Sequence, residues 1–173
     1  MHKIAVVKTH QELLKPVVCQ PIDDEWKTSL QDKWWSTSFT GTRSAAESRL
    51  FDGLITHILT FGGEMVCMPF GEALSEQLVK FGVFLYGDDA RTERGKRSGC
   101  HENASKIVLA SPDNRIIGTG YALSDDGMWR GHSWCIDTDN GQIIETTEKR
   151  VAYFGIIVGK EDSISFANHH ING

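Results

Sequence analysis

Hydrophobic and polar positions along the chain predict helices first and strands afterwards. After Ser44, apolar residues recur at the three- and four-residue spacing of an amphipathic helix. They are Leu50, Leu54, Ile55, Ile58 and Leu59. Ser44 and Glu47 match a capping box, which predicts that this helix begins directly after Ser44. Further helices are predicted over residues 72–85 and 100–110.

Strand patterns dominate the second half of the chain. Segments 115–124 and 128–137 flank an Asp-Asp-Gly turn, and an Asp-Asn-Gly turn precedes a strand segment at 143–146. The apolar run 151–159 predicts a further buried strand. Helices followed by consecutive antiparallel strands indicate an α+β fold, in which N-terminal helices pack on a C-terminal antiparallel sheet. The length suits a single domain over residues 1–173.

The two ends of the chain carry weaker patterns. A short strand is expected at residues 3–7, and a cluster of tryptophans follows it. These tryptophans, which we expect to line the core or a groove, are Trp26, Trp34 and Trp35. The C-terminal segment around His169 and His170 is expected to be a disordered tail rather than a site.

Composition narrows the class of protein. Hydrophobic residues make up 40% and charged residues 24% of the chain, which is typical of soluble globular proteins. A formal charge of −5 argues against binding to nucleic acid through phosphate neutralisation. The basic run at 91–97 is the one counter-signal, and we interpret it as a solvated loop.

Cysteine usage and the N-terminus predict a cytoplasmic protein. The four cysteines are widely spaced and form no Cys-x-x-Cys pair, which favours free thiols in a reducing compartment. Residues 1–11 do not resemble a signal peptide. No apolar stretch reaches the roughly 18 residues that span a bilayer, so no membrane association is expected. Secretion without an N-terminal signal and the oligomeric state remain open.

The segment 98–104 (SGCHENA) carries the candidate nucleophile. It places Cys100 where a glycine-led turn enters a predicted helix. The positive end of the helix dipole and the unpaired backbone N–H groups there favour a thiolate. Small neighbours, Ser98 and Gly99, leave room for a substrate carbonyl. The backbone N–H of Cys100 or of an adjacent residue can then stabilise a developing oxyanion.

The predicted hairpin over residues 128–145 brings a histidine and a carboxylate together. If the turn of this hairpin has a two- or four-residue loop, the sequence numbers of any two residues paired across the strands add up to an odd number. The numbers of His132 and Glu145 also add up to an odd value, so both side chains lie on one face. With a four-residue loop, Glu145 lies opposite Trp134 and diagonal to His132, within reach of long side chains.

These residues suggest a Cys-His-Glu triad. We expect His132 to accept the proton of Cys100 and later to protonate the leaving group. Glu145 then fixes the tautomer of the ring and stabilises the imidazolium. Three further residues are candidates for substrate binding. Asn103, one turn after the cysteine, is expected either to support the loop or to contact the substrate. Trp134 lies on the face of the histidine, and Trp129 lies near the mouth of the site.

The order of the three residues along the chain, Cys100, His132 and Glu145, resembles that of the transglutaminase-like branch of the papain-like fold. The Gly-Cys pair that opens a helix and the His-x-Trp motif on a strand are part of the same resemblance. Residues 97–103 also resemble the nucleophile segment of arylamine N-acetyltransferases and are similar to that of N-terminal glutamine amidohydrolases. The resemblance covers residues 97–150 and implies a papain-like fold and a covalent thioester intermediate. The acid is Glu instead of the usual Asp. The chain is also far shorter than an arylamine acetyltransferase, which speaks against an acetyl-coenzyme A site.

The sequence thus predicts a thiol-dependent acyl-transfer enzyme that needs no cofactor. Its substrate is a protein, a peptide or a small amide, and hydrolysis is favoured over transfer to an amine. Peptidase, isopeptidase and glutamine deamidase activities all remain open. One alternative is a non-catalytic binding module or inhibitor on a papain-like scaffold. A metal site of Cys100, His101, His132 and Cys135 is disfavoured, because residues 132 and 135 point to opposite faces of a strand.

Overall fold

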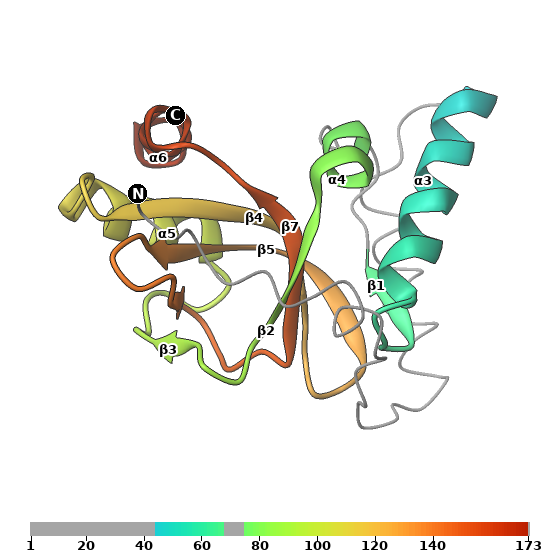
Figure 1. Cartoon of the computed structure of the whole chain (residues 1–173), viewed down its shortest axis with the longest axis horizontal. Coiled ribbons are helices and arrows are strands. Elements are labelled where there is room, and N and C mark those ends of the chain that lie inside the picture. The colour runs from blue at the N-terminus through green and yellow to red at the C-terminus, as the bar shows by residue number, and fades with distance from the viewer. Residues whose placement is uncertain (1–43, 68–74, 173) are drawn as a thin grey trace.

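The computed structural model describes residues 44–67 and 75–172 (Figure 1). Its helices are α3 (Ala45–Leu59), α4 (Ser75–Phe81), α5 (Cys100–Ala110) and α6 (Lys160–Asn172). Its strands are β1 (Met65–Cys67), β2 (Val83–Tyr86), β3 (Arg91–Thr92), β4 (Arg115–Leu123), β5 (Met128–Asp137), β6 (Ile143–Glu145) and β7 (Ala152–Ile157). The strands form one sheet in the order β2-β7-β4-β5-β6-β3, and β1 also pairs with β5. The predicted α+β class is therefore confirmed.

The best-patterned elements begin and end where the sequence predicted. The capping box of α3 is present: the Ser44 hydroxyl accepts from the Glu47 N–H at 3.2 Å, and the Glu47 carboxylate accepts from the Ser44 N–H at 2.8 Å. Helix α5 covers residues 100–110 as predicted. The predicted strand at 3–7 and the three tryptophans near the N-terminus lie outside the described residues.

The predicted helix over 72–85 is wrong in its second half. Helix α4 ends at Phe81, and Val83–Tyr86 forms the edge strand β2, antiparallel to β7. A Cβ on Gly82 would lie only 2.4 Å from the carbonyl oxygen of Leu78. Because glycine has no Cβ, the backbone at residue 82 can pass this close to the end of the helix. The buried side chains of Phe84 and Leu85 belong to different hydrophobic clusters. Consecutive residues of a strand point to opposite faces of the sheet, so the strand allows each of these two side chains to pack in its own cluster.

The sheet is mixed rather than antiparallel. Its central pairs, β4 with β5 and β7, and β5 with β6, are antiparallel as predicted. However, β1 runs parallel to β5, and β3 runs parallel to β6. Both of these short strands precede α5, in a region that the sequence assigned to helices and loops. Residues 91–92 of the basic run therefore form a strand and not a free loop.

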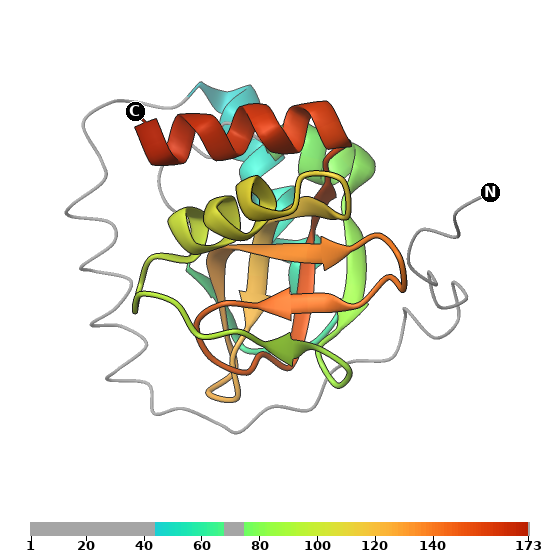
Figure 2. The ribbon, with the colours of Figure 1, turned by 90° about the vertical axis from the view of Figure 1, so that its left-hand side faces the viewer.

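The C-terminal segment is a helix, which corrects the prediction of a disordered tail. Helix α6 packs against α5 and β4, as Figure 2 shows for the two helices. Ser163 and Ala167 are fully buried on its inner face. The Ser163 hydroxyl accepts a hydrogen bond from the N–H of Ile117 at 2.9 Å, so the helix is tied to the sheet as well as packed on it.

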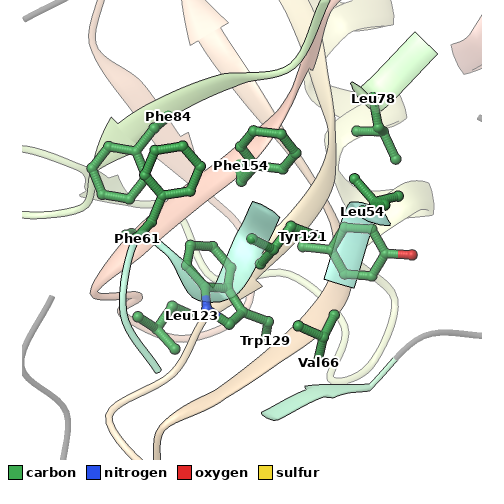
Figure 3. Close-up of a cluster of buried hydrophobic side chains, with 11 residues drawn as sticks. Leu54, Phe61, Val66, Leu78, Phe84, Tyr121, Leu123, Trp129 and Phe154 are labelled. Atoms are coloured by element: carbon green, nitrogen blue, oxygen red, sulfur yellow. The ribbon is translucent and has the colours of Figure 1, made fainter. Parts of the chain in front are cut away.

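Side chains alternate along the central strands and so separate two faces of the sheet. One face carries Tyr121, Leu123 and Trp129, which pack with residues of α3 and α4 (Figure 3). The other face carries Trp134, which packs with Tyr153 of β7. None of the described helices is long and apolar enough to cross a membrane.

Strand β5 changes partners along one edge, and this creates the space for the site. It pairs with β4 over its length. On its other edge it pairs with β1 at residues 128–130 and with β6 at residues 135–136. Among the described residues, no strand pairs with residues 131–134 on that edge. The first turn of α5 approaches the sheet at this gap.

Candidate active site

Cys100 is the first residue of α5 and lies half-buried beside the gap in the sheet. Burial raises the pKa of its thiol, but the hydrogen bond with His132 and the charge of that ring outweigh this effect. Backbone hydrogen bonds from Ser133 and His101 act in the same direction. Together they hold the pKa of Cys100 below its ordinary value.

His132 and Glu145 are in contact, as predicted from the hairpin. The observed pairs, Cys135 with Ile144 and Ile136 with Ile143, correspond to the four-residue-loop register. The Nε2 atom of His132 lies 2.9 Å from Oε2 and 3.1 Å from Oε1 of Glu145. Both side chains are almost completely withdrawn from solvent. Because Nε2 is occupied by Glu145, Nδ1 is the ring nitrogen available to Cys100.

The two partners of His132 favour its charged form. Burial lowers the pKa of the ring, but the hydrogen bonds with Cys100 and Glu145, and the negative charges of both, raise it above its ordinary value. The pKa values of the thiol and of the imidazole thus move towards each other. Both shifts favour the thiolate–imidazolium pair over the neutral pair.

The Glu145 carboxylate is held by a full set of donors. Its Oε1 accepts from the N–H groups of Thr146 (2.8 Å) and Thr147 (2.7 Å) and from the Thr147 hydroxyl (2.9 Å). Its Oε2 accepts from the Tyr153 hydroxyl at 2.9 Å. Burial raises the pKa of this carboxyl, but the bond to charged His132 and the bonds from Thr147 outweigh it and lower the pKa to about 2. The group therefore stays a carboxylate despite being buried.

Sequence reasoning missed Tyr153 and Thr147 as members of this network. Burial and the negative charge of Glu145 raise the pKa of Tyr153, so its hydroxyl remains a donor. A tyrosine inside a buried strand needs a hydrogen-bond partner, and this was the signal available in the sequence. Behind Thr147, Nη2 of Arg150 donates to the threonine hydroxyl at 3.2 Å. Arg150 thereby orients Thr147, which in turn orients the Glu145 carboxylate.

Asn103 is buried and holds the loop before α5, which is one of the two roles expected for it. Its Oδ1 accepts from the Lys96 N–H at 2.9 Å, and its Nδ2 donates to the Lys96 carbonyl at 2.8 Å. A Cβ on Gly95 would lie 2.4 Å from this Oδ1, so the loop needs glycine there. Ser98 completes the loop with a positive φ of 57°.

The two tryptophans are core residues, which corrects their assignment to substrate binding. Trp129 is fully buried and donates from Nε1 to the Gly62 carbonyl at 2.9 Å. Figure 3 shows it between Leu123 and Val66 in the cluster that packs with α3 and α4. The odd spacing between residues 129 and 132 already implied opposite faces. Trp134 is also fully buried and stacks beside His132, with ring centroids 6.4 Å apart.

His101 and Cys135 do not join His132 in a metal site. The Nδ1 atom of His101 lies 2.7 Å from the Ser133 hydroxyl, and the ring stacks on His170 of α6. The thiol of Cys135 is buried and donates to the Ala104 carbonyl at 3.2 Å. Within residues 44–67 and 75–172, no group of three or more potential ligands is placed to hold a metal ion.

A cavity of about 690 Å³ opens at the sulfur. Cys100 and His132 contribute to its wall, together with the loop before α5 and the segment after β6. Four arginines also line it. They are Arg94, Arg97, Arg130 and Arg150. The cavity is therefore large enough for a side chain or a short peptide segment, and it is rich in positive charge.

Comparison with models of protein families, with curated proteins and with solved structures found no significant match for this chain.

Proposed function

We propose that this protein is a thiol-dependent acyl-transfer enzyme on a papain-like, transglutaminase-like scaffold. Cys100 is the nucleophile, His132 the acid and base, and Glu145 the residue that orients the ring. The observation that carries the proposal is that Cys100 interacts with His132, which is itself hydrogen-bonded to buried Glu145, next to an open cavity. A buried inert cysteine has no need of these partners.

The first half of the reaction forms a thioester. The Cys100 thiolate attacks the carbonyl carbon of the substrate amide, and a carbon–sulfur bond forms. Negative charge develops on the carbonyl oxygen. The backbone N–H of Cys100, in the first turn of α5 and therefore without an intrahelical acceptor, can stabilise it. The imidazolium then gives its Nδ1 proton to the leaving nitrogen, the carbon–nitrogen bond breaks, and the amine departs.

The second half releases the acyl group. Neutral His132 takes a proton from water, and the resulting hydroxide attacks the thioester carbonyl. The carbon–sulfur bond breaks, the acid leaves, and the thiolate–imidazolium pair is restored. Throughout both halves the Glu145 carboxylate accepts a hydrogen bond from Nε2–H of His132, which keeps Nδ1 directed at the sulfur.

Hydrolysis of an amide in a peptide, an isopeptide or a glutamine side chain is the reaction we favour. Each of these substrates offers a carbonyl on a side chain or segment that the cavity can hold. Water suffices as the acceptor. The alternative, a binding module that carries the same residues without turnover, makes the opposite prediction in the following experiment.

Acylation by p-nitrophenyl acetate tests the proposal without knowledge of the natural substrate. We expect one acetyl group to appear on Cys100 and to be removed by hydroxylamine, as a thioester is, because an activated thiolate attacks activated esters. Intact-mass measurement followed by peptide mapping detects the adduct and its position. Acetylation confined to lysines, or spread equally over the cysteines, would contradict the proposal and favour the binding module.

A further inference from the structure

The cavity at Cys100 concentrates positive charge on an acidic protein. The chain carries a formal charge of −5, yet four arginines and a single glutamate, Glu148, line the cavity. The arginines come from three separate segments: the loop before α5, strand β5 and the segment after β6. Fields from like charges around a low-dielectric cavity add up and attract ligands of opposite charge.

Two of the arginines are exposed on the rim and have no acidic partner within residues 44–67 and 75–172. In the described part of the chain, neither Arg94 nor Arg97 forms an ion pair. Their loop is nevertheless held in place. The Glu93 N–H donates to the Glu145 carbonyl, and the Gly95 N–H donates to the Thr146 carbonyl, each at 2.8 Å. The loop thus keeps two unneutralised guanidinium groups beside the reactive sulfur.

The other two arginines are fixed by their surroundings. Both Nη atoms of Arg130 contact the Asp126 carboxylate, at 2.9 and 2.5 Å. Arg150 is only 7% exposed and is held by Glu148 at 2.9 Å and by the Ser124 hydroxyl. Its buried Nε–H has no acceptor among the described residues. The charges of Arg130 and Arg150 are thus balanced by Asp126 and Glu148, whereas those of Arg94 and Arg97 are not balanced by any described acidic residue.

On the basis of the proposed function, we propose that the acyl donor is an acidic peptide segment with carboxylates close to the reacting residue. Arg94 and Arg97 are two cations on the loop before α5 with no acidic partner among the described residues, so a ligand that complements them carries more than one anionic group. Carboxylates on neighbouring residues of an extended chain meet this requirement. A neutral amide would leave the rim arginines unused.

Two covalent probes test this inference. They are vinyl-sulfone peptides of the same length, with aspartates flanking the reactive group in one and asparagines in the other. The measurement is the ratio of their second-order rate constants for labelling Cys100. We expect the aspartate probe to react about tenfold faster at low ionic strength, because electrostatic attraction raises association rates by this order. The ratio should fall towards one as salt is added.

Substitution of the rim arginines identifies the source of the preference. In the double variant Arg94→Gln/Arg97→Gln the ratio should fall by about threefold or more. The matched control, Arg49→Gln/Lys80→Gln, removes two exposed charges from α3 and α4. These helices lie on the opposite side of the molecule from α5 and β3 (Figure 1), and the control should keep the original ratio. Thermal unfolding of each variant verifies that it is folded.

The outcomes separate this inference from the proposed function. Rapid labelling of Cys100 by both probes at equal rates would overturn the inference and leave the proposed function standing. An equal fall of the ratio in the rim variant and in the control would also overturn it. Slow labelling by both probes, no faster than that of buried Cys67, would instead contradict the proposed function itself.

Discussion

Replacement of Cys100 by alanine is expected to abolish acylation and turnover while leaving the fold intact. Removal of the nucleophile from a catalytic triad lowers kcat by an amount on the order of 10⁶. Cys100 is only half-buried, so the free energy of unfolding should change by no more than about 1 kcal/mol. Intact-mass detection of the acetyl adduct, together with chemical denaturation, measures both quantities.

Cys67→Ala is the matched control for this variant. The Cys67 thiol is buried in a small cluster with Met65 and Met128, and burial raises its pKa to about 11. The Cys67→Ala variant should therefore lose some stability, but its Cys100 should be acylated at the original rate. Persistent acylation of the Cys100→Ala variant would remove Cys100 from the mechanism.

Glu145→Gln is expected to lower the rate of acylation by about 10²- to 10⁴-fold. In this variant the amide oxygen of the glutamine can keep the hydrogen bonds that Oε1 of Glu145 accepts, but the new NH₂ group then faces Nε2 of His132. Nε2 must become an acceptor, which moves the ring proton to Nδ1. The imidazole can then no longer take the proton of Cys100. The measurement is the acylation rate at saturating p-nitrophenyl acetate, with exposed Glu161→Gln as the control. Undiminished acylation would exclude Glu145 from the proposed role.

The same substitution should change how stability depends on pH. The pKa of Glu145 is about 2 in the folded chain against an ordinary 4.5, so this carboxylate stabilises the fold. Because the folded value is the lower one, the stabilisation is present above about pH 4.5 and is lost as the pH falls towards 2. It amounts to about 3 kcal/mol. The stability difference between wild type and Glu145→Gln should shrink over this interval, and a constant difference would contradict the assignment.

Local pattern was enough to predict the parts of the candidate site that are close in sequence. Helix α5 begins at Cys100 because a glycine precedes it. The pairing of β5 with β6 follows from the turn that joins them. The contact between His132 and Glu145 then needed only the alternation of side chains along a strand.

The rest of the site depends on tertiary structure. Tyr153 reaches Glu145 because β7 pairs with β4, and no short-range pattern fixes that neighbour. The strands β1 and β3 are too short to show a period. The gap that admits α5, and the grouping of Arg94 and Arg97 with Arg150, follow from how these strands pair. Helix α6 was missed because its apolar pattern is weak, although Ser163 and Ala167 anchor it to the sheet.

The rate of alkylation of Cys100 by iodoacetamide as a function of pH tests the central claim most directly. Mass spectrometry reports this rate beside those of Cys67 and Cys135, whose pKa values burial raises to about 11 and about 12. An ion pair with His132 predicts that Cys100 reacts much faster than either thiol and keeps most of its rate below about pH 7. A rate that falls about tenfold per pH unit below 8.5, as for an ordinary thiol, would contradict the account.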